Sequence, residues 1–248
     1  MLLTVDRINV SYGSVQALRG VSMQIDSGEM VALLGANGAG KTTTLRTISG
    51  LIAPTAGEVM FEGSRIDGLP AHEVVTTGIA HLPEGRDLFP SLTVEENLRF
   101  GYWTRRKDKT GYSEALERAF RFFPKLAERR GQAAGTMSGG EQQMLGVARA
   151  LMSGPKLLVV DELSLGLAPL IVEQLFEILS EVNGDGTAVL IVEQFVHMAL
   201  ANSHRAYVLA KGEVVLEDRS RNLANNPDLI ASYLGESEEQ VEAEKARR

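Results

Sequence analysis

The feature that most constrains the fold is a glycine-rich loop that follows a short apolar run. Residues 31–34 read VALL and residues 35–43 read GANGAGKTT, which matches the pattern G-x-x-x-x-G-K-[ST]. Glycines allow the backbone to turn tightly, so that successive N–H groups point at one anion. The helical pattern that follows adds its positive N-terminal end. A chance glycine-rich turn would not require a buried strand before it and a helix after it. The sequence therefore predicts a loop that binds the phosphates of a nucleotide.

The expected contacts within this loop differ from one residue to the next. Lys41 is placed to reach the β- and γ-phosphates, the Thr42 hydroxyl to ligate Mg²⁺, and Thr43 to contact the α-phosphate. The remaining positions contribute mainly backbone groups: Gly35, Ala36, Asn37, Gly38, Ala39 and Gly40. A phosphate loop alone does not specify the task that the nucleotide serves.

Three unbroken apolar runs indicate strands that are covered on both faces, as in a parallel sheet. They are residues 31–34, 157–160 and 189–192. Helical patterns lie between and after them, at about 40–51, 169–183 and 195–202. Strands that alternate with helices favour an α/β domain with a parallel sheet. The first sixty residues instead alternate apolar and polar side chains, which is typical of half-exposed strands.

The segment from about 93 to 152 differs, because it reads as several helices and contains no strong strand pattern. We interpret it as a helical subdomain inserted into a core of about 1–92 and 153–235. Together these parts form one domain, residues 1–235. Residues 236–248 are highly charged with few apolar anchors, so we expect a frayed or partly helical tail.

Composition excludes several classes of function. The 248 residues carry a net charge of −7, so no basic excess points to nucleic acid. There is no cysteine, which rules out disulfides, thiolate metal sites and cysteine nucleophiles. The start, MLLTVDRINV, is too short and too polar for a signal peptide. No apolar run approaches the roughly 18 residues of a membrane span.

An acidic pair follows the second apolar run. Asp161 and Glu162 come directly after LLVV, at the carboxyl end of a predicted buried strand, where open α/β sheets bind their ligands. A lone pair of this kind is more often an ordinary polar end to a strand. Combined with the phosphate loop, it predicts Asp161 as a partner of Mg²⁺ and Glu162 as the base that orients and polarises an attacking water.

A third motif, MSGGEQQ at residues 137–143, begins a predicted helix. Ser138 and Glu141 form an S-x-x-E capping box, which accounts for those two residues. It does not account for Gly139 and Gly140, which are poor residues for a first helical turn. The two glycines and the helix N-terminus predict a second anion-binding surface, distinct from the first.

The motifs GANGAGKT, SGGEQQ and LLVVDE, in this order and spacing, make the chain resemble the ATP-binding cassette (ABC) ATPases over about residues 2–234. The resemblance implies a P-loop NTPase fold of the ABC type. This is a mostly parallel core with an N-terminal antiparallel β subdomain and the inserted helical subdomain. It implies ATP and Mg²⁺ as ligands. It also implies a head-to-tail dimer in which Ser138, Gly139, Gly140 and Glu141 contact the ATP of the partner subunit.

Further positions gain a role only from this resemblance. Tyr12 matches the aromatic residue that stacks on adenine, although a simple strand aromatic is the alternative. Glu84 stands where the family usually has a glutamine ligand of Mg²⁺, and Gln194 stands where most members have a histidine. We expect Gln194 to sense the γ-phosphate or the water of Glu162 without carrying a proton. His197, three residues on, is expected to point elsewhere.

Two segments resemble one branch of this family, the ATPases of branched-chain amino acid importers and their amide and urea relatives. These segments are DELSLGLAP, which contains the acidic pair, and HLPEGRDLFPSLTVEENL. Leu163 departs from that branch, where proline is usual, so the stiffness of the loop is in question. The implied function is an ATPase subunit that couples cassette dimerisation and hydrolysis to solute uptake.

The partners implied are a second ABC ATPase subunit, two integral membrane permease subunits and, indirectly, a solute-binding receptor. The second ATPase would be a related but different chain, with a homodimer as the alternative in isolation. The protein would then lie on the cytoplasmic face of the membrane. The rival function is a soluble ABC-type ATPase that remodels macromolecules. Such proteins usually carry two linked cassettes, a long coiled coil or a basic surface, and this sequence has none of these features.

Overall fold

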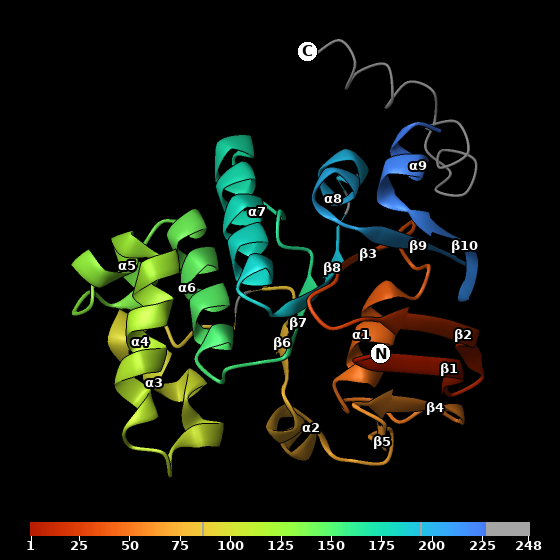
Figure 1. The fold of residues 1–248 in the computed structure, drawn as a ribbon, viewed down its shortest axis with the longest axis horizontal. Helices are drawn as coiled ribbons and strands as arrows, with labels where there is room; N and C mark the ends of the chain where they lie inside the picture. Colours follow the sequence, from red (N-terminus) through yellow and green to blue (C-terminus); the bar gives the residue numbers. More distant parts are fainter. Residues whose placement is uncertain (86, 194, 227–248) are drawn as a thin grey trace.

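Two sheets and a group of helices make up the part of the chain that the computed structural model describes, residues 1–85, 87–193 and 195–226 (Figure 1). The first sheet is antiparallel, with strand order β2-β1-β4-β5. Its strands are β1 (Leu3–Tyr12), β2 (Val15–Ile25), β4 (Ala56–Phe61) and β5 (Ser64–Arg65). A register shift between Val5 and Ile8 changes the spacing of the buried side chains along β1, as a β-bulge does. This sheet corresponds to the predicted half-exposed strands.

The second sheet has six described strands in the order β10-β9-β3-β8-β7-β6. They are β3 (Met30–Leu34), β6 (Ile79–Leu82), β7 (Leu157–Asp161), β8 (Ala188–Val192), β9 (Arg205–Ala210) and β10 (Glu213–Arg219). All neighbouring strands pair in parallel except β9 and β10. Every residue of β3, β7 and β8 is buried. Because these three strands are adjacent and parallel, their carboxyl ends lie side by side.

Helices cover both faces of this second sheet. On the side of the antiparallel sheet lies α1 (Lys41–Ile48), which packs into a core shared by the two sheets. On the other side lie α7 (Pro169–Gly184) and α8 (Val196–Asn202), which bury apolar residues in a second core. Short helices complete the core at its ends: α2 (Ala71–Thr77) and α9 (Ser220–Ala224).

The segment between β6 and β7 forms a separate group of helices, on the left in Figure 1. It contains α3 (Val94–Gly101), α4 (Gly111–Phe122), α5 (Pro124–Glu128), α6 (Gly139–Leu151) and the 3₁₀ turns η1 (Trp103–Arg105) and η2 (Ala134–Thr136). Arg118 and Arg121 of α4 each place a guanidinium nitrogen 2.9 Å from Oδ2 of Asp185, directly after α7. These ion pairs join the helical group to the core.

The fold class predicted from the sequence is confirmed: a mostly parallel core, an N-terminal antiparallel sheet and an inserted helical group. The tail at 236–248 lies outside the described residues. In the described part of the chain, no helix combines the length and the apolar character that crossing a bilayer requires.

Candidate functional site

The glycine-rich loop connects β3 to α1, as the sequence predicts. Gly35 must be glycine because an added Cβ would lie 2.4 Å from the carbonyl oxygen of Leu209 on β9. Gly40 has φ = +111°, a conformation that a residue with a Cβ rarely adopts. Lys41 is buried, and its Nζ donates to the carbonyl oxygens of Gly35 (2.8 Å) and Ala36 (3.2 Å). The ammonium group is thus held inside the curve of the loop.

The acidic pair lies beside this lysine. Asp161 ends β7 and is 1% exposed, and its Oδ1 has no hydrogen-bond partner among the described residues. Burial raises the pKa of Asp161, the Thr42 side chain opposes this by a hydrogen bond, and the charges of Glu162 and Glu84 raise it further. Burial also lowers the pKa of Lys41, against the attraction of Glu162 and Asp161. The charges of the loop lysine and of the acidic pair therefore influence one another directly.

A buried carboxylate oxygen without a partner costs free energy unless a ligand completes it. Among the described residues, no group of three or more His, Cys, Asp or Glu side chains could hold a metal ion by itself. This donor set fits Mg²⁺, which binds through one or two protein oxygens together with substrate phosphates and waters. The Asp161 carboxylate and the Thr42 hydroxyl are the oxygens available here, and the exposed Glu84 is close enough to influence Asp161.

One further residue predicted for the site lies near the loop. Tyr12 ends β1 with 48% of its surface exposed, and its hydroxyl lies 3.5 Å from Oγ1 of Thr43. Its ring is therefore available for stacking beside α1. His197 is exposed in the first turn of α8. Gln194, the predicted sensor, falls outside the described residues.

The SGGE segment forms the predicted helix start at α6. The Ser138 N–H donates to Glu141 Oε2 at 2.9 Å, and the Glu141 N–H donates to Ser138 Oγ at 3.4 Å. Gly140 has a packing role that the sequence did not reveal, because an added Cβ would lie 2.7 Å from Cγ2 of Ile171 on α7. In Figure 1, α6 and α1 lie apart, with α7 and β7 between them. The expected second anion surface therefore belongs to a different part of the molecule from the phosphate loop.

Sequence reasoning missed Glu193, which follows β8 and is 1% exposed. Its carboxylate accepts from both the backbone N–H and the hydroxyl of Ser164, at 3.1 and 2.5 Å. Leu163, the position where proline was expected, packs its side chain into the apolar core. A carboxylate at the end of an unbroken apolar run was the available signal, but its partner is 29 residues away along the chain.

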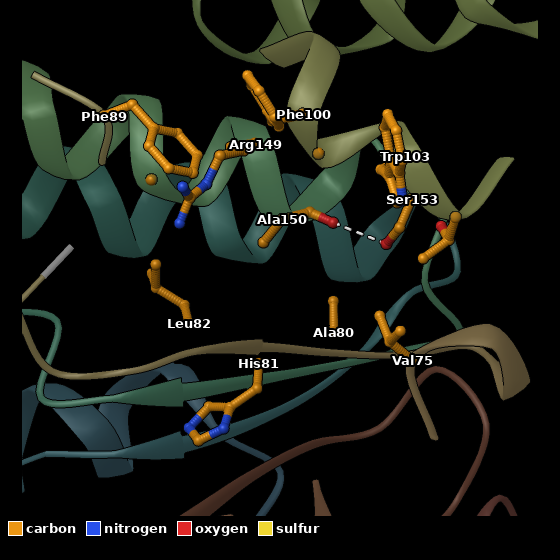
Figure 2. Close-up of a pocket in the computed structure, with 13 residues that line it drawn as sticks. Val75, Ala80, His81, Leu82, Phe89, Phe100, Trp103, Arg149, Ala150 and Ser153 are labelled. Carbon is orange, nitrogen blue, oxygen red and sulfur yellow. Dashed lines mark hydrogen bonds between the residues drawn. The ribbon is translucent and has the colours of Figure 1, made fainter. Parts of the chain in front are cut away.

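A cavity of about 460 Å³ opens between β6 and the helices α3 and α6 (Figure 2). Three exposed aromatic side chains line it: Phe89, Phe100 and Trp103. The rings of Phe89 and Phe100 are 4.8 Å apart, and the guanidinium of Arg149 lies 5.8 Å from the Phe89 ring. The cavity lies next to the segment that carries Glu84, since that segment leaves the end of β6.

The site and the fold are those of a nucleotide-hydrolysing cassette, and the chain belongs to the family described as "ABC transporter", whose profile matches residues 18–164. It is an ATPase of that family. A Pseudomonas aeruginosa protein named as a high-affinity branched-chain amino acid transport ATP-binding protein, BraG, is 47% identical over 94% of this chain and 100% of its own. A probable LivF protein of Archaeoglobus fulgidus, named for the same transport, is 37% identical over 90% of this chain and 94% of its own.

Solved structures agree with these likenesses. A crystal structure described as the ADP conformation of an ATP-binding cassette of an ABC transporter superimposes with a TM-score of 0.83 and 29% identity, covering 95% of this chain and 99% of that one. A dimeric cassette in a post-hydrolysis state, bound to ADP and phosphate, gives a TM-score of 0.78 and 26% identity, covering 89% of this chain and 99% of that one.

Proposed function

We propose that the chain is the ATP-hydrolysing subunit of an importer for branched-chain amino acids. The 47% identity to the Pseudomonas protein over that protein's full length supports the choice of solute. The observation that carries hydrolysis is the position of Asp161 and Glu162 at the end of β7, close enough to Lys41 to oppose its loss of charge. The alternative is that the same subunit serves an importer of amides or urea.

The proposed reaction is in-line attack of water on the γ-phosphorus of ATP. A bond forms from the water oxygen to phosphorus, and the bond from phosphorus to the bridging oxygen of ADP breaks. Glu162 orients the water and accepts its proton. Lys41 exchanges the carbonyl oxygens of Gly35 and Ala36 for phosphate oxygens and stabilises the charge that they carry.

The other predicted residues bind or orient the substrate. Tyr12 stacks on adenine, and the backbone N–H groups of the phosphate loop surround the phosphates. Mg²⁺, when bound with ATP, neutralises phosphate charge, with Thr42, Asp161 and Glu84 as its protein partners. Gln194 donates an amide hydrogen bond to the γ-phosphate or to the attacking water. Because an amide does not titrate, turnover depends little on the titration of any histidine.

A second cassette completes the site. In the proposed head-to-tail dimer, the segment from Ser138 to Glu141 of one subunit caps the γ-phosphate bound by the other. The cassette of 26% identity, described as dimeric and bound to ADP and phosphate, supports dimerisation. In the transporter the second cassette is a related but different chain, with a homodimer as the alternative for the isolated protein.

The membrane subunits dock at the cavity beside α3, and the chain lies on the cytoplasmic face of the membrane. Trp103, Phe100 and Phe89 are 60%, 48% and 43% exposed, and neighbouring exposed apolar side chains of this size mark interaction surfaces. The Glu84 segment begins at the end of β6, which forms the floor of this cavity. Movement of that segment on hydrolysis would thus pass to the docked subunit.

Extraction from native membranes tests the transport function. The chain should be recovered with two integral membrane subunits. Cells that lack it should lose uptake of labelled leucine, and in wild-type cells unlabelled isoleucine or valine should compete with that uptake. Uptake of urea or amides in place of leucine would reassign the solute. Recovery only with ribosomes or nucleic acid would contradict transport. A Phe100→Ala, Trp103→Ala double variant should lose the membrane subunits, whereas Val215→Ser, exposed on β10, should retain them.

A further inference from the structure

We infer that Glu193 is a positioning residue for ATP hydrolysis, because it holds the loop that carries the proposed base Glu162. Glu193 follows the last residue of β8, and Ser164 lies two residues beyond Glu162. The two are joined across adjacent strands, since β7 and β8 pair in parallel up to Asp161 and Val192. The inference rests on the role proposed above for Glu162.

The contact uses both oxygens of the carboxylate. The Ser164 backbone N–H donates to Oε1 at 3.1 Å, and the Ser164 hydroxyl donates to Oε2 at 2.5 Å. Glu193 is 1% exposed and Ser164 is 4% exposed, so water competes little for these bonds. A single residue of the loop is thus fixed through two atoms at once.

The backbone at Glu162 explains why such fixing is needed. Glu162 has φ = +48°, a left-handed conformation that a residue with a Cβ rarely adopts. Its N–H donates to the Val192 carbonyl oxygen at 3.0 Å. The end of β8 therefore binds the loop at two positions. The Val192 carbonyl oxygen accepts from the N–H of Glu162 itself, and the Glu193 carboxylate accepts from Ser164, two residues further on. Strained conformations persist only where the surroundings determine them strongly.

Leu163 lies between these two points of contact and lacks a ring that would fix its φ. Its side chain is 1% exposed and packs into the apolar core, which provides a third point of contact. Side-chain contacts thus add to the backbone hydrogen bonds that hold the loop, such as the one from the Glu162 N–H to Val192. Within the described residues, Ser164 forms hydrogen bonds to one side chain, that of Glu193, and it forms two of them.

The chemistry of the contact predicts which substitutions preserve it. In Glu193→Gln, the amide oxygen accepts from the Ser164 N–H while the amide nitrogen donates to the Ser164 hydroxyl oxygen, because a hydroxyl can both donate and accept. Glu193→Ala removes both bonds, and Ser164→Ala removes one of them. A role in placing Glu162 therefore tolerates glutamine, whereas a role that requires the negative charge does not.

The test is steady-state ATPase kinetics and ATP binding for the full-length chain. Glu193→Ala should lower kcat by about tenfold or more, because small displacements of a catalytic group cost this much, while KM and the Kd for ATP change by less than about twofold. Ser164→Ala should lower kcat by a smaller factor, and Glu193→Gln should recover most of the wild-type value. The double variant Ser164→Ala, Glu193→Ala should be no slower than Glu193→Ala, since both act through one contact.

Three results would overturn the inference: an unchanged kcat in Glu193→Ala, a Glu193→Gln variant as slow as Glu193→Ala, or an equal loss of ATP affinity. If Glu193→Ala does not fold, Glu193→Gln and Ser164→Ala decide the matter, because full activity in Ser164→Ala would be contrary to it. The wild-type rate separates this inference from the proposed function. A wild-type chain without ATPase activity refutes the function, whereas an active wild type with an equally active Glu193→Ala refutes only the positioning role.

Discussion

The partly buried imidazole of His81 predicts a pH dependence of stability whose size follows from its surroundings. His81 lies on β6 and points to the opposite face from Ala80 and Leu82 (Figure 2). The Ser49 hydroxyl donates to the Leu45 carbonyl oxygen at 2.9 Å, so its own oxygen accepts from Nδ1–H of His81 at 3.0 Å. This tautomer leaves Nε2 as a buried lone pair, without a partner among the described residues.

A proton on Nε2 would create a buried charge with an unbonded N–H. Burial, together with the charge of Arg46, accordingly lowers the pKa of His81 from its ordinary value of 6.5 to about 4, against the opposing charge of Asp87. Above the ordinary pKa of 6.5, the ring is neutral in both the folded and the unfolded chain. As the pH falls below 6.5, the unfolded chain binds a proton that the folded chain excludes, so stability is lost until the pH reaches about 4.

The interval from 6.5 to about 4 corresponds to about 3 kcal/mol of unfolding free energy. Of this, about 2.5 kcal/mol should be lost from about pH 7 to about pH 4.5. Urea unfolding at these two pH values measures the loss. In His81→Asn, whose amide can still donate to Ser49, the loss should be smaller than in the wild type by about 2.5 kcal/mol.

His72→Asn is the matched control, because the His72 side chain is 81% exposed. This variant should follow the wild type at both pH values. If His81→Asn and the wild type lose the same free energy on acidification, within about 0.5 kcal/mol, then His81 is not excluded from protonation in the folded chain and the reasoning from burial is refuted.

Two further predictions concern the packing of the helical group on the core. Gly140→Ala should destabilise the chain by about 1 kcal/mol, since crowding against Ile171 outweighs the better helix propensity of alanine. Gly184→Ala, where an added Cβ meets nothing within 4 Å, should be neutral or slightly stabilising in the same thermal melts, and equal effects would contradict the packing role. Asp185→Ala should cost about 1 kcal/mol at low salt and less at high salt, because the carboxylate is 38% exposed and its two arginine pairs are screened. A loss independent of salt in urea titrations would exclude the ion pairs as its cause.

The central sheet was predictable because its inner strands are covered on both faces. The runs at 31–34, 157–160 and 189–192 contain no polar residue, and they form β3, β7 and β8. The strand order could not be read in the same way, because pairing between β3 and β9 joins residues that are far apart along the chain. The four-residue strand β6 ends just before Pro83 and is too short for a clear pattern.

The site was predictable where a local motif carries it, as in the glycine-rich loop and the acidic pair. It was not predictable where the contact partner is distant in sequence. Glu193 and Ser164 are 29 residues apart, and the crowding of Gly140 against Ile171 crosses between two helices. A capping box identified the start of α6, but only the packing of α6 on α7 explains the need for Gly140.

ATP hydrolysis by a Glu162→Gln variant tests the central claim most directly. The purified variant should bind ATP with an affinity like that of the wild type and elute as a dimer in ATP on size-exclusion chromatography. Its kcat should fall by about a hundredfold or more, since a general base contributes on this scale. Glu173→Gln, an exposed substitution on α7, should retain the wild-type rate. Unchanged turnover in Glu162→Gln would contradict the assignment of Glu162 as the base of this ATPase.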